Sequence, residues 1–152
     1  MKIEQITKII EDLDITCATL LSIEEVEKLP LELRKYGNCW WLRSPGDRYS
    51  FAAYAYCGGS VNYRGSYVDY NSYAVRPALQ IKNLNSSNLQ IGDKFVFGEK
   101  EFEIISDSFA FCVTDIGRYC FKEDWKAKDA NDYEKSDVKK YVDDWFNLAS
   151  AE

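Results

Sequence analysis

The chain has 152 residues, with 25 acidic and 19 basic side chains, 11 tyrosines and no histidine. A chain of this length is typical of one compact domain, so we expect a single domain over residues 1–152. The missing histidine excludes Ser-His-Asp and Cys-His catalysis and His-ligated metal sites, and the net charge of −6 argues against a nucleic-acid partner, which needs a basic surface.

The first residues predict a short amphipathic helix. Apolar residues recur at helical spacing over residues 2–13, at Ile3, Ile6, Ile9, Ile10 and Leu13. Acidic residues interrupt the continuous apolar core that a signal peptide needs, and no stretch approaches the roughly 18 apolar residues of a membrane span. We therefore expect neither export by this route nor membrane insertion.

A second helix is expected to begin after Ser22. Glu25 follows three residues later and completes a capping-box pattern, ahead of apolar residues at positions 26, 29, 31 and 33. Because proline breaks the hydrogen-bond ladder of a helix, we expect this helix to be interrupted or restarted near Pro30.

The second half of the chain predicts strands. Residues 78–82 resemble a strand, and the polar connector over residues 82–93 is the most plausible seam in the chain. Residues 94–105 contain two alternating apolar runs around a loop that begins at Gly98, which is a β-hairpin pattern. Residues 108–116 add another expected strand.

The last predicted element is an amphipathic helix. Ser136 is a candidate N-cap, and the apolar residues that follow it share one helical face: Val138, Tyr141, Val142, Trp145 and Phe146. Together these elements predict an α+β fold with a mainly antiparallel sheet and flanking helices.

Residues 47–74 show no helical or strand period and have an unusual composition. They contain seven of the 11 tyrosines but no Lys, Glu, Gln, Met or Trp, although these five types fill 33 of the 152 positions and about six would be expected by chance. Randomising the first two bases of AAC or AAT codons cannot produce any of the five. We therefore expect a long irregular loop region with a diversified sequence.

A segment rich in Tyr, Ser, Gly and Asn also has the composition of antibody recognition loops. Tyrosine provides rigid contact area there, and the smaller residues provide adaptable hydrogen bonds. The alternative is a Gly- and Tyr-rich meander in which Tyr54 and Tyr56 lie on one face of a strand that covers the core.

Two motifs flank this segment: WWLRSPG at residues 40–46 and VRPAL at residues 75–79. The combination resembles a family of small bacterial and phage domains with a C-type lectin-like fold, which includes the variable proteins of diversity-generating retroelements. Those elements copy a template with adenine-specific errors into such a segment. The likeness is close over residues 38–79 and more diffuse elsewhere, and it implies a C-type lectin-like fold with a retroelement-diversified binding surface.

The resemblance separates framework positions from variable ones. The framework positions are Gly59, Val61, Gly65, Val68, Val75, Arg76 and Pro77, and Ala52 and Ala53 are also set apart from the variable positions. Twenty candidate variable positions remain, at 47–51, 54, 56–58, 60, 62–64, 66, 67 and 69–73.

The expected ligand-binding residues all lie in the segment over residues 47–73. They are Arg48, Tyr49, Phe51, Tyr54, Tyr56, Tyr63, Arg64, Tyr67, Asp69, Tyr70, Asn71 and Tyr73. Tyrosine and arginine are enriched at interface hot spots. Trp40, Trp41, Arg43 and Arg76 are expected to be scaffold residues, and an anionic ligand held by the two arginines is the alternative.

We expect no catalytic residue, no bound metal and no cofactor. Cys57 has no His or Lys nearby in sequence, and Cys112 and Cys120 lack further zinc ligands. The five cysteines, without a C-x-x-C pair, fit free thiols in a reducing compartment. An acidic run could offer Asp124, Asp129, Asp132 and Asp137 to Ca²⁺, but it lacks the glycine and spacing of an EF-hand loop. Formylglycine-generating enzymes, which share the lectin-like fold, are the only enzyme analogy.

The sequence thus predicts a non-enzymatic protein that binds a protein or cell-surface ligand. Without an export signal, we expect it in the cytoplasm or incorporated into a phage particle. The alternative is a structural or accessory interaction protein, such as a phage particle component, whose tyrosines pack against a permanent partner.

Overall fold

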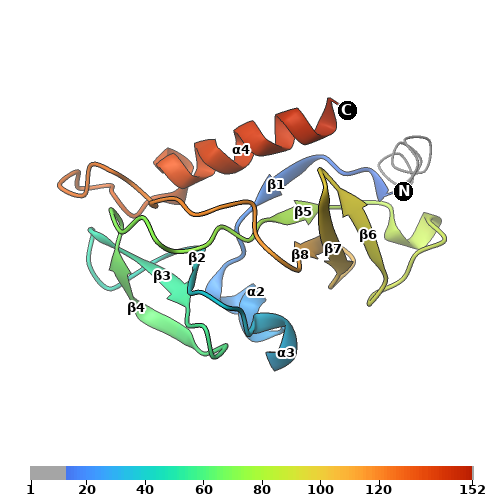
Figure 1. Cartoon of the computed structure of the whole chain (residues 1–152), viewed down its shortest axis with the longest axis horizontal. Helices are drawn as coiled ribbons and strands as arrows, with labels where there is room; N and C mark the ends of the chain where they lie inside the picture. Colours follow the sequence, from blue (N-terminus) through green and yellow to red (C-terminus); the bar gives the residue numbers. More distant parts are fainter. Residues whose placement is uncertain (1–12, 152) are drawn as a thin grey trace.

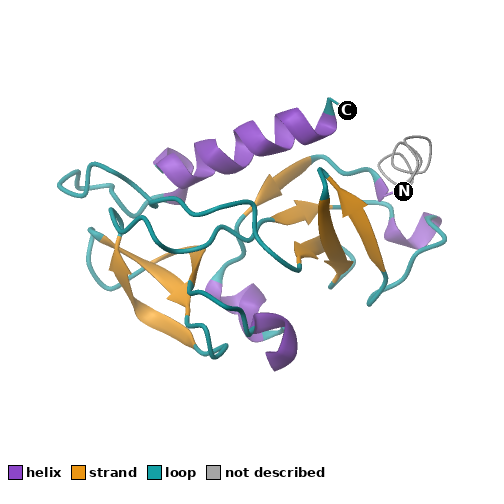
Figure 2. Ribbon diagram, in the orientation of Figure 1, coloured by secondary structure: helices purple, strands orange, loops and turns teal. Residues whose placement is uncertain are grey.

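The computed structural model describes residues 13–151, which form two β-sheets, one long helix and several short ones (Figures 1 and 2). The α+β class with mainly antiparallel strands is therefore confirmed. The helix predicted over residues 2–13 lies outside the described residues except for Leu13, which is buried. No helix in the described part of the chain is long and apolar enough to cross a bilayer.

One sheet has five strands in the order β1-β5-β8-β7-β6, and all its neighbours are antiparallel. The strands are β1 (Cys17–Thr19), β5 (Ala78–Gln80), β6 (Lys94–Phe97), β7 (Lys100–Ile104) and β8 (Phe109–Cys112). The predicted hairpin is confirmed as β6–β7. Its turn residues Gly98 and Glu99 have φ of 58° and 65°, as a tight type I′ turn requires.

The other predicted strands of this sheet are confirmed in shorter form. The strand expected over residues 78–82 is β5, and the strand expected over residues 108–116 is β8. The polar connector over residues 82–93 contains a 3₁₀ turn, η1 (Leu84–Ser86), whose Leu84 is buried in the core.

The second sheet has three strands in the order β2-β3-β4: β2 (Trp40–Pro45), β3 (Phe51–Ala55) and β4 (Val61–Tyr67). The expectation of a long irregular region after residue 47 is therefore wrong, because β3 and β4 lie within it. The two strands escape a period-2 search for different reasons. Between the pairs Ala52–Ser66 and Tyr54–Asn62, β4 has two more residues than β3, so a bulge in β4 breaks its alternation of side chains. In β3, Ala52 packs in one core cluster and Ala53 and Ala55 in the other, so both faces of the strand are apolar.

The helices follow the sequence predictions. The short helix α2 (Ile23–Glu27) has the predicted capping box, and a separate turn, α3 (Leu31–Arg34), restarts after Pro30. The long helix α4 (Asp137–Ser150) begins after Ser136, whose Oγ accepts the N–H of Lys139 at 3.0 Å. A 3₁₀ turn, η2 (Tyr133–Lys135), precedes it.

The core has two parts, one on each side of β2. Trp41 belongs to the larger cluster with Phe102 and Phe121, and the helix α4 packs on this cluster through Val138 and Val142. Trp40 points to the opposite side, into a smaller cluster with residues of α2. Both indoles are fully buried. In Figure 1, α4 runs along one side of the molecule and α2 and α3 lie on the other. The three-stranded sheet is thus fixed from both faces.

Candidate ligand-binding face

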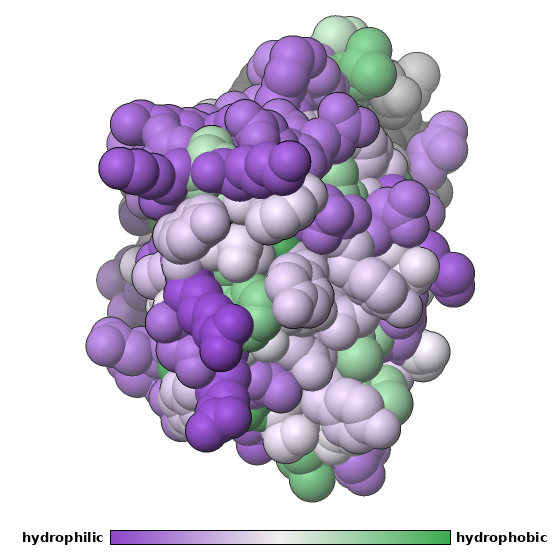
Figure 3. Space-filling model, turned by 90° about the vertical axis from the view of Figure 1, so that its left-hand side faces the viewer, coloured by the Kyte–Doolittle hydropathy of each residue, from purple (hydrophilic) through white to green (hydrophobic). Residues whose placement is uncertain are grey.

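The variable positions proposed from the sequence lie at the surface. Of the twenty, 12 are exposed, seven are half-buried, and one, Ser50, is buried. Ala52, Ala53 and Val68 in the same stretch behave in the opposite way because they are fully buried, whereas the framework positions Val61 and Gly65 are half-buried. We call the exposed and half-buried side chains of residues 47–73 the tyrosine face. Figure 3 looks onto this side of the molecule, where side chains of intermediate hydropathy cover much of the surface and strongly hydrophilic ones border them.

Five tyrosines of this face expose about half of their surface. The exposed fractions lie between 49% and 57%, for Tyr49, Tyr56, Tyr63, Tyr67 and Tyr70. Such a ring combines a large apolar contact area with a hydroxyl that can donate or accept a hydrogen bond. The other expected contact residues Arg48, Arg64, Asp69 and Asn71 are also exposed.

Two further tyrosines connect the face to the core. Tyr73 contacts Tyr70 on its outer side, with ring centroids 4.9 Å apart, and Trp41 on its inner side at 4.7 Å. Tyr54 packs against Tyr73 at 4.8 Å, and its hydroxyl accepts an amide N–H of Asn62 at 3.1 Å. Burial raises the pKa of Tyr73 to about 12, so its hydroxyl stays protonated at neutral pH. Tyr73 therefore links the exposed Tyr70 to the core.

Tyr63 and Arg64 lie in the bulge of β4, and both side chains are exposed. Gly65 ends the bulge with φ of 90°, and a Cβ at this position would lie 2.5 Å from the carbonyl oxygen of Ala52. Only glycine fits such a close approach without strain. The hydroxyl of Tyr63 donates to the carboxylate of Glu27 at the end of α2, and this hydrogen bond raises the pKa of Tyr63.

The other edge of the face contains Phe51 and Arg48. Phe51 packs edge-to-face on Tyr67 at 4.7 Å, and the Arg48 guanidinium lies over the Phe51 ring at 5.4 Å. The carbonyl oxygen of Arg48 accepts the side-chain amide of Asn131 at 2.9 Å. The loop before α4 therefore supports this edge from outside the variable segment.

Arg76 is buried among aromatic rings instead of facing a ligand. Its guanidinium lies 4.5–4.7 Å from the ring centroids of Tyr36, Trp40 and Phe111. It donates to the carbonyl oxygens of Leu33, Val113 and Thr114, each at 3.1 Å. Burial lowers the pKa of Arg76 to about 10, which leaves it charged at neutral pH. With 1% exposure, this side chain has no surface to offer an anion.

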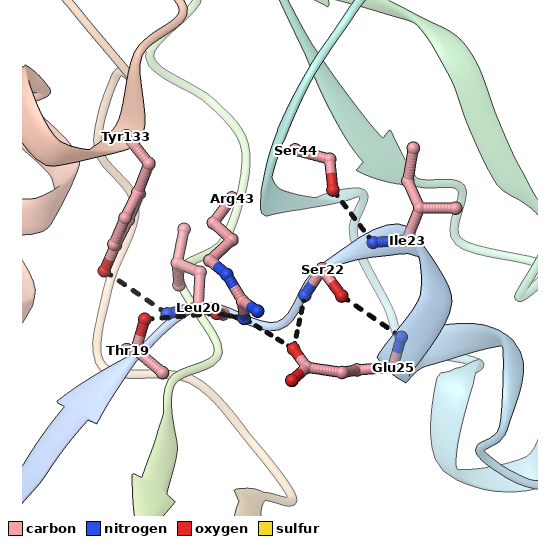
Figure 4. Close-up of polar contacts among 8 residues, drawn as sticks. All are labelled: Thr19, Leu20, Ser22, Ile23, Glu25, Arg43, Ser44 and Tyr133. Atoms are coloured by element: carbon pink, nitrogen blue, oxygen red, sulfur yellow. Dashed lines mark hydrogen bonds and ion pairs between the residues drawn. The ribbon is translucent and has the colours of Figure 1, made fainter.

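Arg43 joins β2 to the loop between β1 and α2 (Figure 4). Its Nη1 donates to the carbonyl oxygen of Leu20 at 2.8 Å and to the carboxylate of Glu25. The same carboxylate accepts the N–H of Ser22 at 2.8 Å within the capping box. Burial by itself would raise the pKa of Glu25, but the hydrogen bonds from Arg43 and Ser22 outweigh it, so the pKa lies below its usual value.

Sequence reasoning missed the loop that borders the tyrosine face. Asp69 and Asn71 line an open hollow of about 480 Å³ together with residues of a later loop, Arg118, Tyr119, Cys120 and Glu123. The backbone of the two segments is joined, because the N–H of Lys122 donates to the carbonyl oxygen of Val68 at 2.9 Å. No motif marks this loop, and only tertiary structure brings it to the face.

The acidic run does not converge on one point. Asp132 caps η2, Asp129 pairs with Lys135 at 3.3 Å, and the Asp137 carboxylate accepts the N–H of Glu123 at 2.8 Å. Within residues 13–151 no group of three His, Cys, Asp or Glu side chains is arranged to hold a metal ion. Cys112 and Cys120 are both buried, and burial raises the pKa of each thiol to about 11.

Comparison with known proteins gives one family similarity. A family model described as a domain of unknown function (DUF6273) matches residues 18–83, which run from β1 to just beyond β5 and include the whole three-stranded sheet. No curated protein and no solved structure matches the chain. The matched region contains the whole tyrosine face.

Proposed function

We propose that this protein is a ligand-binding module of the C-type lectin-like class, whose tyrosine face is diversified by a retroelement and contacts a protein or cell-surface ligand. The face itself has no catalytic role. The proposal places the protein in the cytoplasm or within a phage particle, where a partner chain or the particle would display it.

The observation that carries the proposal is the agreement between the variable positions that the family resemblance implies and the exposure of these positions. Of the twenty positions, 19 are exposed or half-buried. Between them, Ala52, Ala53 and Val68 are fully buried, Val61 is half-buried, and Gly65 is conformationally restricted. A segment that tolerates many sequences must keep the core and the turns constant while its surface side chains vary.

The chemistry of the face suits a protein ligand. The half-exposed tyrosines lie on β4 and on the loops that flank β3 and β4, and a tyrosine side chain has few rotatable bonds, so little side-chain entropy is lost on binding. The hollow beside Asp69 and Asn71 is open to solvent, unlike the enclosed pockets that usually bind small molecules.

The gene neighbourhood and sister sequences provide the first test. Diversification predicts an adjacent reverse transcriptase, a template repeat that differs mainly at adenines, and substitutions concentrated at the twenty positions. A permanent structural partner predicts the opposite, since the exposed tyrosines would then be invariant. Substitutions spread equally over framework and face would contradict both the proposed diversification and the permanent partner.

A display experiment tests the binding capacity directly. One library randomises the exposed positions of the tyrosine face, and a control library randomises exposed positions of α4, at Lys140, Asp144, Asn147 and Leu148. Both are selected against a purified folded protein such as lysozyme. We expect specific binders from the first library only. If the α4 library yields binders as often, the tyrosine face has no special capacity and the proposal fails.

A further inference from the structure

Two half-buried cysteines meet at one end of the tyrosine face, where β2 begins and β3 ends. Cys39 directly precedes β2, and Cys57 lies two residues beyond the end of β3. Trp40 pairs with Ala55 in the sheet register, and the N–H of Tyr36 donates to the carbonyl oxygen of Cys57 at 3.1 Å. The chain is thus tied to the 55–57 stretch on both sides of Cys39.

The two residues also interact through the Cys39 thiol. Burial raises the pKa of Cys39; a hydrogen bond with the Cys57 backbone lowers it in part, and the nearby Cys57 thiol raises it again. The pairing of Trp40 with Ala55 and the backbone hydrogen bond from Tyr36 to Cys57 hold the two cysteines on neighbouring segments of the chain. A disulfide needs Cα atoms about 4.4–6.8 Å apart, a separation that neighbouring segments at the end of a sheet allow.

The remaining cysteines have other surroundings. Cys17 lies on the five-stranded sheet, where its thiol donates to the side-chain oxygen of Gln80 at 3.1 Å. Cys112 and Cys120 are buried, and their neighbouring titratable groups are charged residues rather than thiols. Among the described cysteines, Cys39 and Cys57 therefore form the pair best placed to react with each other.

We propose that Cys39 and Cys57 form an intramolecular disulfide when the protein meets a hydroperoxide. One thiolate attacks the peroxide oxygen, which breaks the O–O bond and gives a sulfenic acid and, after protonation of the leaving group, water or an alcohol. The second thiol then attacks the sulfenic sulfur, forms the S–S bond and releases water. The two thiols lose two electrons and two protons, and the hydroperoxide is reduced by the same two electrons.

The disulfide would restrain one edge of the tyrosine face. Cys57 follows Tyr56 and precedes the turn at Gly58 and Gly59. A covalent link to Cys39 joins this turn to the residues before β2, which are held in the core by Trp40. Oxidation would therefore stiffen the edge of the face that carries Tyr56 without altering the twelve exposed side chains.

The test is oxidation of the whole purified chain with a small excess of hydrogen peroxide, followed by non-reducing peptide mass spectrometry. We expect a single linked peptide pair containing Cys39 and Cys57, a mass lower by two hydrogens, and an upward shift of the thermal unfolding midpoint that dithiothreitol reverses. The C57S and C39S variants should lose both the linked pair and the shift. The C17S variant is the matched control and should retain both.

Other products would overturn the inference. A disulfide between chains, a link that involves Cys17, or Cys57 oxidised to the sulfinic acid while Cys39 stays reduced would each show that the two thiols do not react together. None of these outcomes bears on the binding capacity of the tyrosine face, which the library selection measures separately.

Discussion

At the scale of single residues, Arg76 has the clearest structural role in the VRPAL motif, because it connects three segments of the backbone. The Arg76 guanidinium is enclosed by three aromatic rings and donates hydrogen bonds to three backbone carbonyl oxygens. One of these carbonyls belongs to α3, and the other two lie in the stretch after β8. Its Nη1 is buried without a hydrogen-bond partner among the described groups. The planar guanidinium group has five N–H donors and can therefore bind three separate carbonyl oxygens, and a lysine ammonium cannot reproduce that geometry.

The first prediction concerns this arginine. R76M should destabilise the protein by about 3 kcal/mol, because three backbone carbonyls lose their donor and the aromatic rings around the buried guanidinium lose a cation. Urea unfolding measures the change, and R76K should recover only part of it. R48M is the control, since Arg48 is exposed and its loss should cost less than about 0.5 kcal/mol. Equal effects of the Arg76 and Arg48 substitutions would show that Arg76 is not a scaffold residue.

The second prediction separates a framework glycine from a variable one. G65A should destabilise the fold by at least about 2 kcal/mol, because φ is 90° and the new Cβ would meet the carbonyl oxygen of Ala52. At Gly58 the nearest atom to a new Cβ is 3.8 Å away, on the Tyr56 ring, so G58A should change stability by less than about 0.5 kcal/mol. The pair is compared by chemical denaturation, and a neutral G65A would refute the framework assignment.

At the scale of elements, α2 is only five residues long and depends on its capping box. An isolated helix of this length is unstable in water, so its stability must come from caps and packing. Glu25 serves both purposes, because one carboxylate accepts from Ser22 at the helix start and from Arg43 of β2.

The third prediction follows from the lowered pKa of Glu25. The folded state favours the carboxylate, so this stabilisation is complete well above the ordinary pKa of 4.5 and is lost as the pH falls through the folded pKa. E25Q should therefore cost about 1 kcal/mol at neutral pH and progressively less at an acidic pH below the folded pKa of Glu25. Urea unfolding at both pH values measures the difference. E24Q, in the same turn but exposed, is the control, and a pH-independent effect of E25Q would contradict the assignment.

The elements also show where sequence patterns succeed. The capping box, the Gly98–Glu99 turn and the apolar face of α4 are local devices, and each was predicted correctly. The strand β4 escapes prediction because a bulge breaks the alternation that identifies a strand. Only the alternative meander places Tyr54 on a strand, because β3 has core residues on both faces and so shows no alternation. Trp40 and Trp41 were expected to be scaffold, but only the structure shows that they fill two different clusters.

At the scale of the whole molecule, the two sheets depend on each other. The indole Nε1 of Trp41 donates to the carbonyl oxygen of Tyr119 at 2.9 Å, and its ring packs on Phe121 at 5.7 Å. The strand β5 lies between β1 and β8 in the five-stranded sheet. Without residues 109–112, which form β8, β5 would lose one of its two neighbouring strands. The tyrosine face is therefore held by parts of the chain that follow it.

The fourth prediction is that a fragment of residues 18–83, the stretch that the family model matches, does not fold alone. Its Trp41 and β5 would lose the partners that residues 109–121 supply, and the fragment lacks about half of the buried apolar residues of the core. Poor dispersion in a ¹H–¹⁵N spectrum and the absence of cooperative thermal unfolding would agree with this. A well-dispersed spectrum would show instead that the three-stranded sheet is an independent unit.

The sequence by itself determined the α+β class of the fold, the helix caps and the tight hairpin. These features depend on neighbouring residues in the chain, so they can be seen without coordinates. Tertiary structure alone decided that the tyrosines lie on the strands β3 and β4 and on the loops that flank them, that Arg76 is enclosed by aromatic rings, and that the loop around Tyr119 borders the face. Each of these depends on contacts between residues far apart in the sequence, and the free energy of such contacts is set by packing that no local pattern contains.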